Sequence, residues 1–167
     1  MAKPTTYATP ICLVLTLLTI ISIVFGYLNH NALLITIFLL PTVAYEAYRT
    51  EGETTRWASW VLLILIIAEL VMIIFKINFD LASFSSQSYA YVSGYFVPLG
   101  DVKIIAPGIM AVLSLILFFR TIGKYTKWLS VLIFLSSFAI VYTLDPNIFK
   151  SLLSSSILQG LFNYSHF

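Results

Sequence analysis

The chain has 167 residues, of which 60% are hydrophobic and only 10% charged, and its mean hydropathy is +0.98. Soluble domains carry roughly a quarter charged residues, so this composition excludes an ordinary soluble protein. The formal net charge is +2, and the chain has no basic tract of the kind that binds nucleic acid. The composition therefore predicts a protein that lives in a bilayer.

Five apolar runs follow one another along the chain, each close to the roughly 20 residues that cross the hydrocarbon core as a helix. They would form one all-α, polytopic membrane domain over the whole chain, 1–167, with short turns and tails and no separate soluble domain. The five expected transmembrane helices lie at about 8–28, 32–48, 57–78, 103–121 and 127–144.

Two other segments have a more polar character. Residues 79–101 are rich in serine, phenylalanine and tyrosine, and tyrosine suits the membrane interface, where its ring meets acyl chains and its hydroxyl meets water. We expect an outer loop on the membrane surface there, with an ordered lid or partner-binding loop as the alternative. Asp145 and Pro146 form a typical helix start. We expect a short interfacial helix at about 146–162.

The distribution of basic residues predicts the orientation, because cytoplasmic loops collect Lys and Arg. With five helices, six such residues fall on the side of the N-terminus and three on the other side. We therefore expect a multi-pass protein of the cell membrane with the N-terminus in the cytoplasm and the C-terminus outside. The two groups are Lys3, Arg49, Arg56, Arg120, Lys124 and Lys127 against Lys76, Lys103 and Lys150.

One short sequence occurs twice: "RTEGETTRW" at 49–57 returns as "RTIGKYTKW" at 120–128. Each copy lies between two apolar runs and combines three residues suited to a helix corner. Glycine tolerates the left-handed conformation after a helix, threonine can accept free N–H groups of the next helix, and tryptophan prefers the headgroup level. We interpret both as cytoplasmic corners, built on Gly52, Thr55 and Trp57 and on Gly123, Thr126 and Trp128.

The repeat has two explanations, which stay open at this stage. An ancient duplication would make 30–78 and 101–144 two hairpins of like orientation, as in transporters with parallel repeats. Against it, residues 30–48 and 101–119 share no identical residue at the same offset. Convergence on the same corner chemistry would explain the repeat without common descent.

Glu69 is an ionisable residue near the middle of the third apolar run, and such a residue is a functional-site hypothesis by default. Lys76 lies seven residues further on, about 10 Å along a helix axis, which is too far for a direct pair. Glu69 could be a proton or cation site in a wet cavity. Alternatively, it could be a structural group that forms a hydrogen bond across a helix contact.

The second expected helix carries a polar stripe with helical spacing, formed by Thr42, Tyr45, Glu46 and Arg49. Glu46 and Arg49 can pair one turn apart, so the stripe is either a helix end that satisfies its own charges or a polar vestibule leading toward Glu69.

The first expected helix has small residues at the same spacing, which allow close helix packing. These are Thr19, Ser22 and Gly26.

The sequence lacks the common catalytic and ligand-binding motifs: we find no Ser-His-Asp arrangement, no phosphate-binding glycine loop and no helix-borne metal motif. We expect no catalytic residue, metal or cofactor of the chain's own, although lipid or another apolar ligand can contact it. The leading hypothesis is a non-catalytic subunit of a larger membrane complex, with membrane lipids and other membrane subunits as partners and no nucleic acid. The alternative is a small homo-oligomeric transporter, or a proton or cation channel, that uses Glu69.

Overall fold

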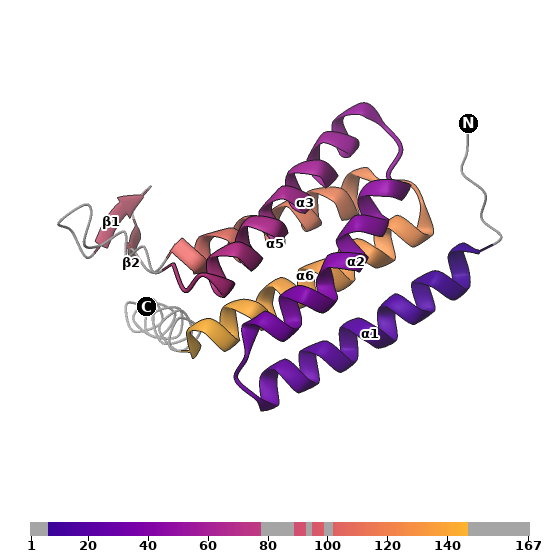
Figure 1. Cartoon of the computed structure of the whole chain (residues 1–167). Helices are drawn as coiled ribbons and strands as arrows, with labels where there is room; N and C mark the ends of the chain where they lie inside the picture. The colour runs from indigo at the N-terminus through magenta and orange to yellow at the C-terminus, as the bar shows by residue number, and fades with distance from the viewer. Residues whose placement is uncertain (1–6, 78–88, 93–94, 99–101, 147–167) are drawn as a thin grey trace, which may run out of the picture.

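Long helices make up most of the protein in this computed structural model, which describes residues 7–77, 89–92, 95–98 and 102–146 (Figure 1). The prediction of an all-α, multi-pass membrane fold is confirmed for the described residues apart from one short strand hairpin. The helices are α1 (Ala8–Leu28), α2 (Ala32–Arg49), α3 (Glu53–Ile74), α5 (Val102–Arg120) and α6 (Lys124–Leu144).

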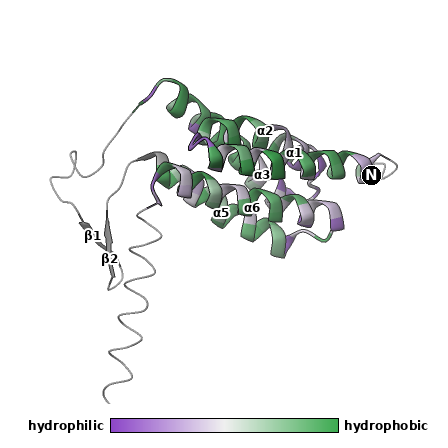
Figure 2. Cartoon of the chain, turned by 90° about the horizontal axis from the view of Figure 1, so that it is seen from below, coloured by the Kyte–Doolittle hydropathy of each residue, from purple (hydrophilic) through white to green (hydrophobic). Residues whose placement is uncertain are grey.

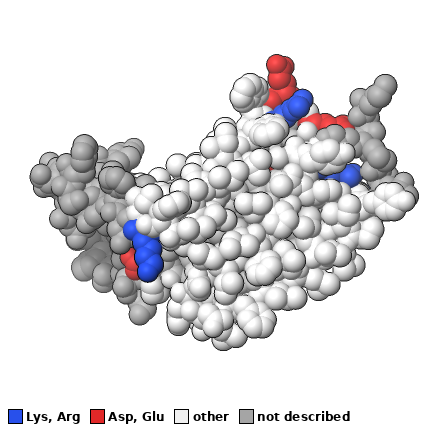
Figure 3. Space-filling view, in the orientation of Figure 1, with Lys and Arg blue, Asp and Glu red and all other residues white. Residues whose placement is uncertain are grey.

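Four of these helices, α1, α2, α3 and α6, are long and apolar enough to cross a membrane. The fifth, α5, has 19 residues of similar character. Hydrophobic residues cover the middle of the helices (Figure 2), and on the face shown in Figure 3 the charged side chains lie at the two ends of the bundle. An uncharged belt between two charged ends is what a bilayer requires of a spanning protein.

Four helices form a ring, in the order α2, α3, α5 and α6, with α6 closing back onto α2. The chain reverses direction from each of these helices to the next, so neighbours in the ring run antiparallel, as in an up-and-down bundle. The remaining helix, α1, lies outside the ring and packs against α2 and α6 (Figure 1). The ring therefore consists of two hairpins, α2–α3 and α5–α6, packed side by side.

The interior of the ring combines an apolar cluster with buried polar side chains, among them Glu46, Ser59 and Glu69. All four ring helices contribute to one cluster of buried side chains, and most of its members are completely inaccessible to solvent. This cluster contains Ala32, Ile35, Leu39 and Val43 of α2, Leu62 and Ile66 of α3, Met110 and Leu117 of α5, and Ile133 and Ile140 of α6.

The helix boundaries differ from the expected ones mainly at the corners. We expected helices from Trp57 and from Lys127, but α3 begins at Glu53 and α6 at Lys124. The error arose because apolar runs were taken as helices, whereas a helix can continue through polar residues at the membrane surface. At its other end, α3 stops at Ile74 rather than at 78, and Lys76 follows in the left-handed region with φ +50°, a conformation that ends many helices.

The expected outer loop, 79–101, contains an antiparallel hairpin of two short strands, β1 (Tyr89–Val92) and β2 (Tyr95–Pro98). Tyr89 pairs with Pro98, and Val92 pairs with Tyr95. Tyrosine, valine and phenylalanine favour strands, a preference that we overlooked in this segment. The remainder of the segment and nearly all of the expected surface helix at about 146–162 lie outside the described residues.

Replacing two helical glycines, Gly26 and Gly108, by alanine should change the stability of the protein in different ways. A Cβ at Gly26 would overlap the side chain of Ile35, which is completely buried and cannot move aside, whereas a Cβ at Gly108 of α5 would meet nothing within 4 Å. We expect Gly26→Ala to destabilise the protein by about 1–3 kcal/mol through overpacking. Gly108→Ala should be neutral or stabilise it by up to about 1 kcal/mol, because alanine favours helix.

Thermal unfolding of the two variants in the same detergent checks this prediction. A lower melting temperature for Gly26→Ala alone agrees with the packing of α1 on α2. Equal melting temperatures would show that Gly26 does not contact α2 as described.

Candidate functional site

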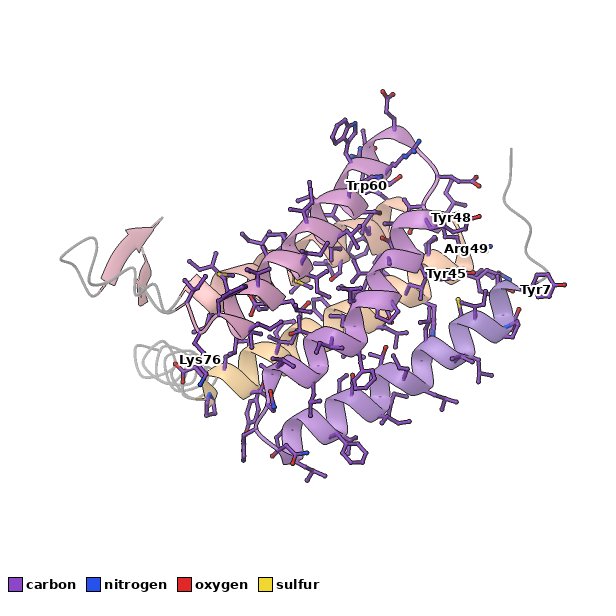
Figure 4. All side chains as sticks on the ribbon, viewed as in Figure 1. Tyr7, Tyr45, Tyr48, Arg49, Trp60 and Lys76 are labelled. Carbon is purple, nitrogen blue, oxygen red and sulfur yellow. The ribbon has the colours of Figure 1, made fainter. Side chains whose placement is uncertain are left out.

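The two copies of the repeated sequence lie at the same end of the helix ring and face each other across a cavity of about 490 Å³. We call this cavity the corner pocket. Figure 4 shows Arg49 and Tyr45 at this end of the bundle, far from Lys76. The pocket is lined by Arg49, Glu51, Gly52, Thr54 and Thr55 of the first corner and by Arg120, Thr121, Ile122, Gly123, Tyr125 and Thr126 of the second.

Equivalent positions of the two corners make equivalent hydrogen bonds. The Thr50 hydroxyl donates to the carbonyl oxygen of Glu46 at 2.9 Å, and the Thr121 hydroxyl donates to that of Leu117 at 2.6 Å. The serines one turn into each following helix also agree. The Ser59 hydroxyl donates to the Thr55 carbonyl oxygen at 3.0 Å, and the Ser130 hydroxyl donates to the carbonyl oxygen of Thr126 at 2.9 Å. The local chemistry of the two corners is therefore largely the same.

The helices beside the corners also match in which positions are buried, although their residues differ. Positions related by the repeat offset are buried together in α2 and α5 and again in α3 and α6. This shared burial pattern favours duplication, which stays a prediction. Examples of such pairs are Leu39 and Met110, Val43 and Ser114, Glu46 and Leu117, Leu62 and Ile133, Ile66 and Ser137, and Glu69 and Ile140.

The corners differ at their glycines. Gly52 has φ +112°, a conformation that favours glycine, whereas Gly123 has φ −70° and ψ 130°, which other residues adopt readily. The expected role of a permissive turn residue therefore applies to Gly52 and is wrong for Gly123.

The expected capping by the corner threonines is wrong. The hydroxyl of Thr55 lies 2.9 Å from the carbonyl oxygen of Glu51 and 3.1 Å from that of Gly52, to which it donates, and the hydroxyl of Thr126 donates to the carbonyl oxygen of Gly123 at 2.8 Å. Neither α3 nor α6 has a side-chain hydrogen bond at its N-cap. The reason is that each helix begins two residues before its threonine, which is therefore inside the first turn rather than ahead of it.

The two corner tryptophans lie in the second turn of their helices and are largely exposed, with 71% of Trp57 and 51% of Trp128 accessible. The indole Nε1 of Trp128 donates a hydrogen bond to the Thr16 hydroxyl of α1 at 2.8 Å. Exposed tryptophan near a helix end suits the headgroup level of a membrane.

The polar stripe of α2 divides into two parts. Thr42 and Glu46 are completely buried, and the Thr42 hydroxyl lies 3.3 Å from that of Thr19 in α1. Tyr45 and Arg49 are half-buried; the Arg49 guanidinium donates to the Tyr45 hydroxyl at 3.4 Å and lies 5.0 Å from the centre of the Tyr125 ring.

Glu46 and Arg49, which we expected to pair, instead contact different groups. The Thr50 hydroxyl shares its one proton between the Glu46 carbonyl oxygen and Oε1 of Glu46, which lies at 2.5 Å, and the Ser59 hydroxyl lies near the same carboxyl group from α3. The other oxygen, Oε2, has no hydrogen-bond partner among the described residues. Glu46 is thus a buried carboxyl group between α2 and α3, close to the corner pocket in sequence but turned into the protein.

Glu69 is also completely buried. It lies on the face of α3 that carries Leu62 and Ile66, and both of these belong to the interior cluster of the ring. The carboxyl group is therefore directed into the ring rather than toward lipid. Since α2 and α3 are antiparallel, Glu69 lies toward the opposite end of the bundle from Glu46, and the structure does not bring the two groups together.

The small residues of α1 lie on the side of the helix that packs against the rest of the protein. Thr19, Ser22 and Gly26 are all buried, and Gly26 lies against Ile35 of α2. The hydroxyls of Thr19 and Ser22 donate to carbonyl oxygens of their own helix at 2.7 and 2.8 Å.

Sequence reasoning did not propose three members of this end of the protein as site residues: Arg120, which was counted only among the basic residues, Tyr125 and Ser59. Arg120 occupies the position of Arg49 in the second copy of the repeat, so the repeat itself could have drawn attention to it. Tyr125 has no such signal, because Thr54 takes its place in the first copy.

Comparison with protein-family models, curated proteins and solved structures found no match to this chain. Among the described residues, no three His, Cys, Asp or Glu side chains gather in a way that could hold a metal ion.

The unequal glycines allow a matched test of the two corners. Gly52→Ala forces an L-residue into φ +112°, whereas Gly123→Ala keeps an allowed φ. In both variants the new Cβ must displace the hydroxyl of the threonine three residues on, so that cost is shared. We expect Gly52→Ala to be the less stable variant by about 1–3 kcal/mol, the usual cost of such backbone strain.

Chemical or thermal unfolding of both variants in one detergent measures the difference. If Gly123→Ala proved as unstable as Gly52→Ala, the two corners would share one backbone conformation, contrary to the description above.

Proposed function

We propose that this protein is a non-catalytic subunit of a larger membrane complex, with membrane lipids and the helices of other membrane subunits as its partners. The observation that carries the proposal is the apolar cluster inside the ring. Ten buried apolar residues from all four ring helices pack together there, and an apolar cluster of this kind does not favour the passage of ions. A role in packing and support fits such a bundle better than conduction.

The outer surface supports the same proposal. On α5, Gly108 is exposed and a Cβ added there would meet no atom within 4 Å, while Ile105, Ile109 and Val112 around it are exposed and apolar. An exposed glycine in a spanning helix allows another helix to approach its backbone closely. A neighbouring subunit could therefore pack on this face of α5.

We further propose that the corner end faces the cytoplasm and that the membrane is the cell membrane. Arg49, Arg56, Arg120, Lys124 and Lys127 lie at this end, whereas the described part of the chain has Lys76 and Lys103 at the other. Five against two agrees with the preference of basic residues for cytoplasmic loops.

The alternative function, a homo-oligomeric transporter or a proton or cation channel, is favoured by one observation. Two carboxyl groups, of Glu46 and Glu69, are completely buried within the helices of the ring. Ionisable residues inside a membrane protein often mark ion or proton pathways. A pathway would then require an open conformation or an interface between copies.

The mass of the purified complex separates the two functions. The tagged full-length chain, extracted from its native membrane in mild detergent, should co-purify with different chains in fixed stoichiometry if it is a subunit. Gly108→Leu should reduce that co-purification several-fold without lowering the yield of the chain itself, whereas Val14→Leu, an exposed control on α1 rather than on this face of α5, should leave it unchanged.

Particles whose mass is a multiple of 18.8 kDa would instead contradict the subunit proposal. Proton or cation flux into liposomes would then be the decisive observation. A channel that uses Glu69 must lose this flux in Glu69→Gln, because an amide cannot ionise, although the amide keeps the shape and hydrogen-bonding capacity of the side chain.

A further inference from the structure

The corner pocket has an excess of positive charge. Two arginines, Arg49 and Arg120, are among its lining residues, and the single acidic residue among them is Glu51. The formal charge of the lining is therefore 2 − 1 = +1. The two arginines occupy equivalent positions of the repeat, each at the last residue of a helix, and come from the two different hairpins.

Arg49 is held in position by its neighbours. Its guanidinium lies over the ring of Tyr125 at 5.0 Å and donates to the Tyr45 hydroxyl at 3.4 Å. Arg120 is exposed at the end of α5. An arginine fork can donate two parallel hydrogen bonds to phosphate, and a phosphate group has enough oxygens to accept from two arginines at once.

Two helix N-termini add donors to the same cavity. The first intrahelical bonds of α3 and α6 run from Arg56 to Gly52 and from Lys127 to Gly123, which leaves the N–H groups of 53–55 and 124–126 without an acceptor in their own helices. Neither helix has a side-chain cap, and Thr54, Thr55, Tyr125 and Thr126 line the pocket.

At the N-terminus of α6, no acidic side chain of the first turn offsets the positive charge. Helix α6 has no acidic residue in its first turn and begins at Lys124, whereas α3 has Glu53 in its first turn. The N-terminus of a helix carries partial positive charge, and a nearby cation adds to it. An anion in the corner pocket would offset this accumulated charge.

We infer that the corner pocket binds a phosphate group, between Arg49 and Arg120 and the first turns of α3 and α6. The exposed Trp57 and Trp128, in the second turns of the same helices, are at the level that tryptophan takes among lipid headgroups. Basic pockets between spanning helices at the cytoplasmic side take up anionic lipid headgroups. A phospholipid is therefore the expected source of the phosphate, and free phosphate is the other source of the same chemistry.

Lipid binding to the purified full-length chain tests this inference. We expect phosphatidic acid, added to the detergent-solubilised protein, to raise the melting temperature in a saturable way, whereas phosphatidylcholine does not. Arg49→Gln/Arg120→Gln should raise the apparent Kd for phosphatidic acid by about tenfold or more, the scale of one or two charge-assisted hydrogen bonds.

The matched control is Arg56→Gln/Lys127→Gln. It also removes two positive charges, but from another pair of equivalent repeat positions. These two residues do not line the pocket. This variant should keep the wild-type Kd within about twofold, because surface charge alone contributes little at ionic strengths that screen it. If the glutamine pair at 49 and 120 fails to fold, Arg49→Lys/Arg120→Lys replaces it and should show a weaker affinity that retains part of the binding.

Inorganic phosphate distinguishes the two sources. If inorganic phosphate raises the melting temperature without any lipid, and competes with phosphatidic acid at similar concentration, the pocket is a site for free phosphate. If only the lipid acts, the site is for a headgroup. The inference is overturned if wild-type protein responds to neither, if the variants at 49 and 120 bind like wild type, or if the control pair loses affinity equally.

Discussion

The structure depends on the absence of water from the membrane core, where each polar group must find its partner within the protein. The buried hydroxyls satisfy this requirement locally. Those of Thr36, Ser136 and Ser137 each donate to the carbonyl oxygen one turn earlier in the same helix, at 2.8 to 3.0 Å. Such groups add little attraction between helices. The helices are therefore held together by close packing of apolar and small side chains, which also explains why Gly26 of α1, against Ile35 of α2, must remain small.

At the membrane surface, polar groups no longer need a partner within the protein, and this is why the two corners can bind a ligand. Once the chain leaves the hydrocarbon, the free N–H groups of a helix start can be satisfied by water or by a ligand. The packing of the two hairpins brings two such helix starts together with the two arginines that precede them. The corner pocket thus follows from the ring arrangement, and its proposed affinity for phosphate follows from the pocket. The apolar cluster and the polar end are two results of one architecture.

The fold could be predicted from the sequence because apolar length alone identifies spanning helices. The helix starts at Glu53 and Lys124 could not, because polar residues outside the hydrocarbon carry no hydropathy signal. The corner motif was recognised, but its threonines were assigned as caps since their distance to the helix start was misjudged. Arg120 could be assigned to the corner pocket only from the ring arrangement, which places it in the same pocket as Arg49. The partners of Glu46 were also hidden, because Thr50 and Ser59 come from a turn and from another helix.

The central claim is that the two corners meet at one end of the ring, and cross-linking tests it most directly. In a Cys12→Ala background, cysteines would replace Thr54 and Ile122, which line the pocket from opposite corners, and a short bis-thiol reagent would be applied to the folded protein. The account predicts an intramolecular cross-link for this pair and none for Thr54→Cys with Asn29→Cys, since α2 separates those ends by about 27 Å. Failure of the first pair, or equal cross-linking of both, would contradict the arrangement.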